Sequence, residues 1–146
     1  MSRLAAAIGF ALVIHASPSL ASTPVDEVRT VIAAMNKAAE ELDADEFMRS
    51  YWDSPDLVIT FDGQTMRGWT TILGEQRRWW SDKSAGITFK EERAPEIVAQ
   101  SDDIVTSIQW MKVAKAGSKP SQLVITSVWK KVPQGWRVVV AHETLR

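Results

Sequence analysis

The hydrophobic pattern of the chain changes once, near Ile87, and this change constrains the fold more than any other feature. Before Ile87, apolar side chains recur every three or four positions, which is the spacing of amphipathic helices. After it they alternate with a period of two, as in strands that bury one face. Short turn sequences join these later segments, so they are expected to pair as antiparallel neighbours. The pattern predicts an α+β domain in which helices pack on an antiparallel sheet.

The first half predicts three helices and a hairpin. Thr23, Pro24 and Asp26 form a capping box with proline at the first helical position, so a helix begins there and carries an apolar stripe as far as Leu42. The strand 57–61 ends in an Asp-Gly turn and returns from Met66. The further helices are expected over 45–52 and 69–80.

The second half predicts five strand segments, over residues 87–93, 96–100, 104–113, 121–132 and 136–144. Proline is excluded from the middle of a sheet, so Pro95 indicates a bulge that bends the sheet. The sequence shows no internal repeat and no linker. We therefore expect one domain.

Residues 1–21 have the pattern of a secretory signal peptide. A basic start precedes an apolar run over 4–14, and a small-residue stretch ends at Ala21. The apolar run is shorter than the roughly 20 residues that a membrane span needs. We expect cleavage after Ala21, a domain over residues 22–146 in the periplasm or outside the cell, and no membrane association after cleavage.

Composition excludes several classes of function. The 17 basic and 18 acidic side chains are spread without blocks, which gives no electrostatic basis for nucleic-acid binding. The chain has no cysteine, and after cleavage His142 is its only histidine, so neither a thiolate site nor a multi-histidine metal site can form within one subunit. Phosphate-cradling and dinucleotide-binding glycine motifs are missing as well. We expect no metal and no cofactor.

The order of these elements and several anchor residues carry a resemblance to a known family. The anchors are the segment 47–57, Gly68-Trp69, and Gly135-Trp136 leading to Ala141-His142. Together they resemble the nuclear transport factor 2-like superfamily, and within it the uncharacterised SnoaL-like secreted domains. The resemblance implies a strongly curved sheet wrapped round the first helix as a conical barrel with a pocket. Its members include isomerases, dehydratases, cyclases, hydrolases and binding modules, so the fold leaves the function open.

His142 is the candidate catalytic residue. Strict alternation along the last strand places it on one face with Trp136, Val138 and Thr144, and places Glu143 on the other. An imidazole titrates near neutral pH, so His142 can act as a general acid, a general base or a hydrogen-bond donor. The resemblance supports this assignment, because the family has a histidine at this place. The alternative is a structural histidine near the end of the sheet.

The candidate ligand-binding residues are mostly aromatic. Seven tryptophans supply more flat apolar surface than a core of this size normally uses, which favours a pocket for a flat, apolar or aromatic molecule. Core packing remains the alternative for each tryptophan. Gln109 is a further polar strand residue that can supply a pocket hydrogen bond. The predicted ligand-binding set is Tyr51, Trp52, Trp69, Trp110, Thr126, Trp129 and Thr144.

Three functions remain open at this point. The favoured one is an exported domain that binds a small, mostly apolar or aromatic molecule in the conical pocket. The second is a cofactor-free isomerase, dehydratase or hydrolase that uses His142 as general acid or base. The third is a dimeric interaction module with a vestigial pocket. A homodimer is expected in any case, because the sheet has two semi-apolar faces and the helices can cover only one.

Overall fold

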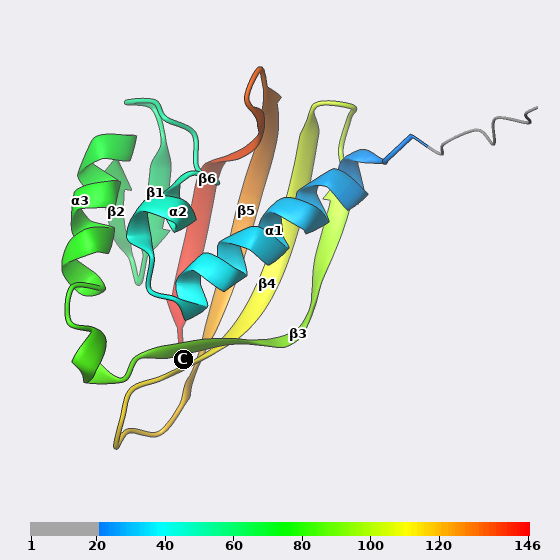
Figure 1. Ribbon diagram of the computed structural model, residues 1–146. Coiled ribbons are helices and arrows are strands. Elements are labelled where there is room, and N and C mark those ends of the chain that lie inside the picture. The colour runs from blue at the N-terminus through cyan, green and yellow to red at the C-terminus, as the bar shows by residue number, and fades with distance from the viewer. Residues whose placement is uncertain (1–20) are drawn as a thin grey trace, which may run out of the picture.

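The computed structural model describes residues 21–146 (Figure 1). The predicted signal peptide lies outside this range, apart from its last residue. Within residues 21–146, no helix is both long and apolar enough to cross a membrane. In chain order the elements are α1 (Pro24–Glu40), α2 (Ala44–Met48), β1 (Val58–Phe61), β2 (Gln64–Arg67), α3 (Trp69–Trp79), a short 3-10 helix η1 (Lys83–Ala85), β3 (Thr88–Ala99), β4 (Ile104–Ala114), β5 (Ser121–Val132) and β6 (Gly135–Leu145).

Local sequence chemistry sets the start of α1. The Thr23 hydroxyl accepts a hydrogen bond from the backbone N–H of Asp26, and the Asp26 carboxylate accepts one from the backbone N–H of Thr23. This confirms the predicted capping box. The buried stripe runs over Val28, Ile32 and Met35, which belong to the same core cluster as side chains of β4, β5 and β6. Thus α1 is the long helix that covers the concave side of the sheet.

The six strands form one sheet in the order β2-β1-β6-β5-β4-β3. The strands from β3 to β6 pair with their sequence neighbours in antiparallel fashion, as predicted from their short turns. However, β1 lies parallel to β6, so the sheet is mixed and the expectation of a purely antiparallel sheet needs this correction. A parallel neighbour is reached through a long connection, and here that connection contains α3 and the whole of β3 to β5.

The predicted bulge at Pro95 lies within a single strand. Segments 87–93 and 96–100 merge into β3, whose pairing with β4 shifts register between Glu91 and Arg93 and again between Arg93 and Glu96. Extra residues on one strand bend it. Figure 1 shows the result, because β3 leaves η1 across the lower end of the molecule and then turns to run beside β4.

A second bulge, in β6, decides which side chains face the helices. Trp129 of β5 pairs with Val138, and its neighbour Val128 pairs with Val140, so Val139 is an extra residue with no partner in β5. Trp136 and Val138 are buried before the bulge, and Ala141 is buried after it. The inward face of β6 therefore changes from even-numbered to odd-numbered residues at Val139.

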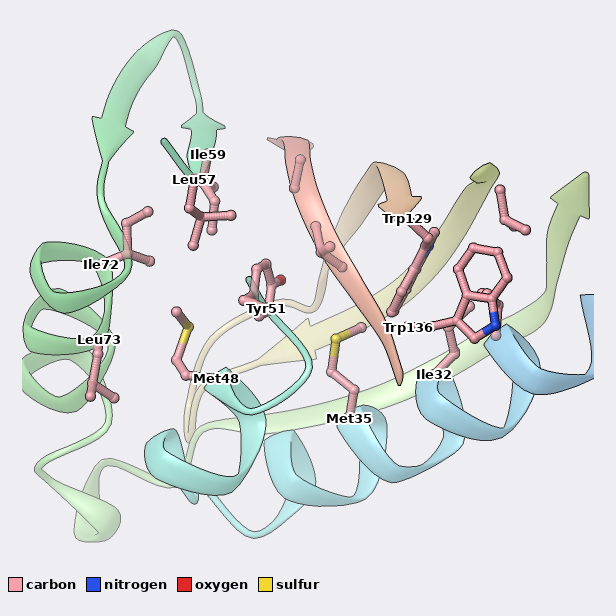
Figure 2. Close-up of a cluster of buried hydrophobic side chains, with 14 residues drawn as sticks. Ile32, Met35, Met48, Tyr51, Leu57, Ile59, Ile72, Leu73, Trp129 and Trp136 are labelled. Carbon is pink, nitrogen blue, oxygen red and sulfur yellow. The ribbon is translucent and has the colours of Figure 1, made fainter. Parts of the chain in front are cut away.

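The core lies between α1, the loop after α2, α3 and the inward face of the sheet (Figure 2). Trp129 and Trp136 pack near Ile32, and Tyr51 lies between Met48 and Met35. The indole Nε1–H of Trp129 donates to the Ser107 hydroxyl at 2.8 Å, which satisfies a polar group inside the core.

Candidate ligand pocket

A pocket of about 310 Å³ opens between the helices and the inward face of the sheet. It lies toward the C-terminal end of β6, the end marked C in Figure 1. On the helix side it is lined by Met35 and Ala39 of α1, Phe47 of α2 and Trp80 at the end of α3. On the sheet side the apolar lining includes Met111, Leu123 and Ile125. The pocket is thus mostly apolar, as small-molecule sites usually are.

Aromatic rings form two groups on its wall. Phe47 lies edge-on to Trp80 with ring centroids 5.0 Å apart, and Trp80 lies 5.4 Å from Phe89. Phe61 of β1 lies 6.0 Å from Trp79, which is partly exposed at the mouth of the pocket. The pocket therefore offers several ring faces and edges to a bound molecule.

Two polar side chains lie in one row across the floor of the pocket. Gln109 of β4 pairs with Ile125 of β5, and Ile125 pairs with Glu143 of β6. All three line the pocket, so the carboxyl and the amide flank the Ile125 side chain. Neighbouring strands are about 4.8 Å apart, which puts the backbones of Gln109 and Glu143 roughly 10 Å from each other. A ligand lying over Ile125 can contact both polar groups.

Of the residues between 21 and 146 that line this pocket, Glu143 is the only one with a charged side chain. Burial raises the pKa of Glu143 to about 7, because the apolar surroundings disfavour its charged form. Burial also raises the pKa of the Tyr51 hydroxyl, and the nearby charge of Glu143 adds to that effect. Among residues 21–146, no hydrogen bond and no neighbouring charge offsets the effect of burial on the pKa of Glu143.

Gln109 is buried without a partner. Its side chain is 2% exposed, and neither its Oε1 nor its Nε2 makes a hydrogen bond with any group in the part of the chain that the structure describes. The Ser127 hydroxyl, on the adjacent inward position of β5, is also buried without a partner. A buried polar group that lacks a hydrogen bond costs about 1–3 kcal/mol. A ligand polar group that reaches Gln109 would remove that cost.

The family assignment rests on the sequence as well as on this architecture. The sequence profile of the SnoaL-like domain matches residues 28–144. The chain belongs to the SnoaL-like family. Comparison with curated proteins gives no significant match.

Solved structures place this SnoaL-like domain in the nuclear transport factor 2-like fold. A nuclear transport factor 2-like protein of unknown function from Shewanella oneidensis is 20% identical with a TM-score of 0.73, and the match covers 84% of this chain and 99% of that one. A second, from Pseudomonas putida, is 15% identical with a TM-score of 0.72 and coverage of 82% and 84%. A protein from Streptomyces avermitilis that is named, provisionally, as a dehydratase is 15% identical with a TM-score of 0.70 and coverage of 84% and 95%. At these identities the likeness establishes the fold.

His142 of this SnoaL-like domain does not face the pocket. It is exposed on the outer face of the sheet, where its Nε2 lies 3.3 Å from the Thr144 hydroxyl. Strict alternation assigned it to the face of Trp136 and Val138, and the bulge at Val139 is the physical reason why this placement is wrong. The same bulge turns Glu143 inward, so the titratable group in the pocket is a carboxyl.

The other predicted ligand-binding residues also lie elsewhere. Tyr51 and Trp129 belong to the core, and Trp69 packs against it with its indole N–H donating to the Met48 carbonyl at 2.9 Å. Trp52 is half-buried after α2, and its backbone N–H donates to the Val138 carbonyl. The remaining three lie outside the pocket lining, with Trp110 stacked 3.3 Å under the Arg93 guanidinium, Thr126 exposed and Thr144 beside His142.

The polar residues that do line the pocket carry a recognisable sequence signal. Glu143 lies two positions after the apolar Ala141 and two positions before the apolar Leu145. Gln76 lies four positions after Ile72 and continues the buried stripe of α3. A polar residue at an apolar periodic position is typical of a binding site or a satisfied buried group. Gln109 is the one polar strand residue for which the sequence prediction of a pocket position is confirmed.

Metal ligation has no support in the described part of the chain. Among residues 21–146, no three histidine, aspartate or glutamate side chains lie close enough together to hold a metal ion.

Proposed function

We propose that this SnoaL-like domain binds a small, mostly apolar molecule in the pocket, with Glu143 and Gln109 as its polar anchors. The observation that carries this proposal is the buried, unpartnered amide of Gln109, which lines an otherwise apolar pocket in the same row as a lone carboxyl. Export, predicted from residues 1–21, would place this binding in the periplasm or outside the cell.

The shape of the pocket argues against a vestigial one. Trp80 packs against Phe47 and Phe89 on the wall, and Trp79 lies at the mouth, so the tryptophans border the space without filling it. Each polar group that faces an apolar space lowers the stability of the folded protein. A pocket without a function would not be expected to keep two of them.

Filling the pocket tests the proposal directly. Ile125→Trp places an indole between Gln109 and Glu143, so we expect the neutral dye N-phenylnaphthylamine to bind the variant at least about ten-fold more weakly than the parent. Fluorescence enhancement measures the affinity, and circular dichroism checks the fold. Val98→Trp is the matched control, because Val98 is 56% exposed and lies outside the pocket lining. Equal dye binding by a folded Ile125→Trp protein, or no binding by the parent, contradicts the proposal.

A second candidate function uses the same residues for proton transfer. A general acid or base works best when its pKa lies near the working pH, and the pKa of Glu143 is about 7. Glu143 thus takes the place that the sequence had suggested for His142 in a cofactor-free isomerase, dehydratase or hydrolase. If the domain is such an enzyme, Glu143→Gln abolishes turnover while N-phenylnaphthylamine still binds. If it is a binding module, the parent protein releases its bound molecule chemically unchanged.

The outer face of the sheet supports the proposal of a homodimer. No helix covers this face in Figure 1, and Val140 on it is 44% exposed. Val140 pairs with Val128 of β5 and Val58 of β1, and the next row on this face holds His142 and Thr126. The middle of this face therefore carries no cluster of like charges that would repel a second copy. We expect light scattering to give a dimer at micromolar concentration, and Val140→Glu to give a folded monomer. A monomeric parent protein contradicts the proposal.

A further inference from the structure

The pocket lining carries one acidic group that no basic group in the described part of the chain neutralises. The polar side chains that residues 21–146 contribute to this lining are those of Glu143, Gln109, Gln76 and Asn36, and none of these residues is a lysine, arginine or histidine. The Asn36 Nδ2 already donates to the Glu91 carboxylate at 3.1 Å, which leaves the Asn36 oxygen free to accept. Arg77 and Arg78 of α3 are exposed and paired with Asp45 and Glu75. Nothing in the lining therefore balances a negative charge on Glu143.

A ligand that supplies a positive charge would correct this balance. A buried charge is tolerated when it is paired and hydrogen-bonded, and an ammonium group can donate to a carboxylate and to an amide oxygen at once. Within residues 21–146, no group donates to the Gln109 Oε1, and no hydrogen bond contributes to the pKa of the Glu143 carboxyl. Both side chains flank the same residue, Ile125. The floor of the pocket thus offers two hydrogen-bond acceptors, one on each side of Ile125, to a cationic ligand.

The aromatic wall favours the same chemistry. A cation near the face of a tryptophan or phenylalanine ring is attracted by the negative charge on that face. The Phe47, Trp80 and Phe89 cluster and the Phe61–Trp79 pair both belong to the pocket lining that contains Glu143. The rings also accept the apolar part of a ligand, so one molecule can satisfy both the charge and the apolar walls.

We propose that the pocket selects a small apolar molecule carrying a positively charged amine, with the ammonium group held between the Glu143 carboxylate and the Gln109 amide oxygen. This inference rests on the proposed binding function and narrows it to one class of ligand. Two titratable groups take part on the protein side, Glu143 in the lining and Tyr51 in the core near it. Raising the pH ionises Glu143 first and strengthens the binding of an amine that stays protonated.

Three probes of one shape test the ligand class. Naphthylmethylamine is a cation, naphthylmethanol is neutral and naphthylacetate is an anion at pH 8. Isothermal titration calorimetry at pH 8 is expected to rank them in that order, with the amine at least about ten-fold tighter than the alcohol. At pH 5, where Glu143 is protonated and the amine is still charged, this advantage is expected to shrink to about two-fold or less.

Two variants locate the charge that is responsible. Glu143→Gln is expected to remove the preference for the amine at pH 8, so that the amine and the alcohol bind this variant with affinities within about two-fold of each other. Glu40→Gln is the matched control, since it deletes an exposed carboxyl of α1 outside the pocket lining, and it is expected to keep the preference.

The outcomes separate this inference from the proposed function. Equal binding of amine and alcohol, or tighter binding of the alcohol, overturns the amine class and leaves the apolar pocket standing. A preference that survives Glu143→Gln also overturns it. If no probe binds and N-phenylnaphthylamine does not bind either, then both the inference and the proposed function fail.

Discussion

Replacing Glu143 by glutamine is expected to raise the free energy of unfolding at pH 8 by up to about 3 kcal/mol. In the unfolded chain this carboxyl titrates near 4.5, whereas burial raises its pKa to about 7 in the folded protein. Between these values the folded protein binds more protons, so its stability falls as the pH rises from about 4.5 to about 7 and stays low above that. The shift corresponds to about 3 kcal/mol. Glutamine is neutral and avoids this loss.

The pH profile of unfolding distinguishes this effect from a general one. Urea unfolding at pH 4 and pH 8 is expected to show a gain for Glu143→Gln only at the higher pH, since both proteins are uncharged at this position near pH 4. Glu40→Gln, on the exposed side of α1, is expected to change stability by less than about 0.5 kcal/mol at either pH. A parent protein whose stability rises between pH 5 and pH 7 would show that the pKa of the half-buried Glu143 carboxyl is not raised in the folded protein.

Trp129→Ala is expected to destabilise the domain by about 3–5 kcal/mol. The Trp129 side chain is 0% exposed on the inward face of β5, and its indole N–H is bonded to the Ser107 hydroxyl. Truncation leaves a large cavity beside Ile32 and deprives the buried serine of its donor, and both effects cost free energy. Chemical denaturation measures the loss. Binding of N-phenylnaphthylamine per folded molecule is expected to stay within about two-fold, because Trp129 does not line the pocket.

Trp79→Ala is the matched comparison for this prediction. Trp79 is 39% exposed and lies at the pocket mouth against Phe61. Its truncation is expected to cost about 1 kcal/mol or less in stability and to weaken dye binding. The opposite pattern, with Trp129→Ala losing dye affinity at little cost in stability, would return Trp129 to the ligand site that the sequence analysis suggested.

Local chemistry made much of the fold predictable. The start of α1 follows from Thr23, Pro24 and Asp26, three neighbours whose hydrogen bonds form within one turn. The hairpins from β3 to β6 follow from short turns between alternating segments. The parallel pairing of β1 with β6 was not predictable in this way, because it joins segments far apart in the chain and no local pattern records which strand edge β1 will meet.

The candidate site was less predictable, and the reason lies in one residue. Gln109 lies opposite the bulge of β3, but the extra residues belong to β3. The strand β4 therefore keeps its alternation, and the inward position of Gln109 could be anticipated. Glu143 follows Val139, where three consecutive valines hide the change of phase. The alternation of polar and apolar residues normally shows which side chains share a strand face. Since Val139 and Val140 are both apolar, that alternation gives no information at this point. The acid between Ala141 and Leu145 was the remaining signal.

The bulge at Val139 also makes the chemistry of the pocket unusually easy to exchange in evolution. Insertion of one further residue after Val139, or pairing of Val139 itself with Val128, would shift the end of β6 by one position, turn the imidazole of His142 inward and move the carboxyl of Glu143 to the solvent. The helices and the hairpins before Val139 would keep their places, because the change lies downstream of the bulge on the last strand. A single inserted codon would thus exchange the carboxyl in the pocket for an imidazole on an unchanged scaffold. Related domains with nearly identical frames can therefore differ in the titratable group that faces the pocket.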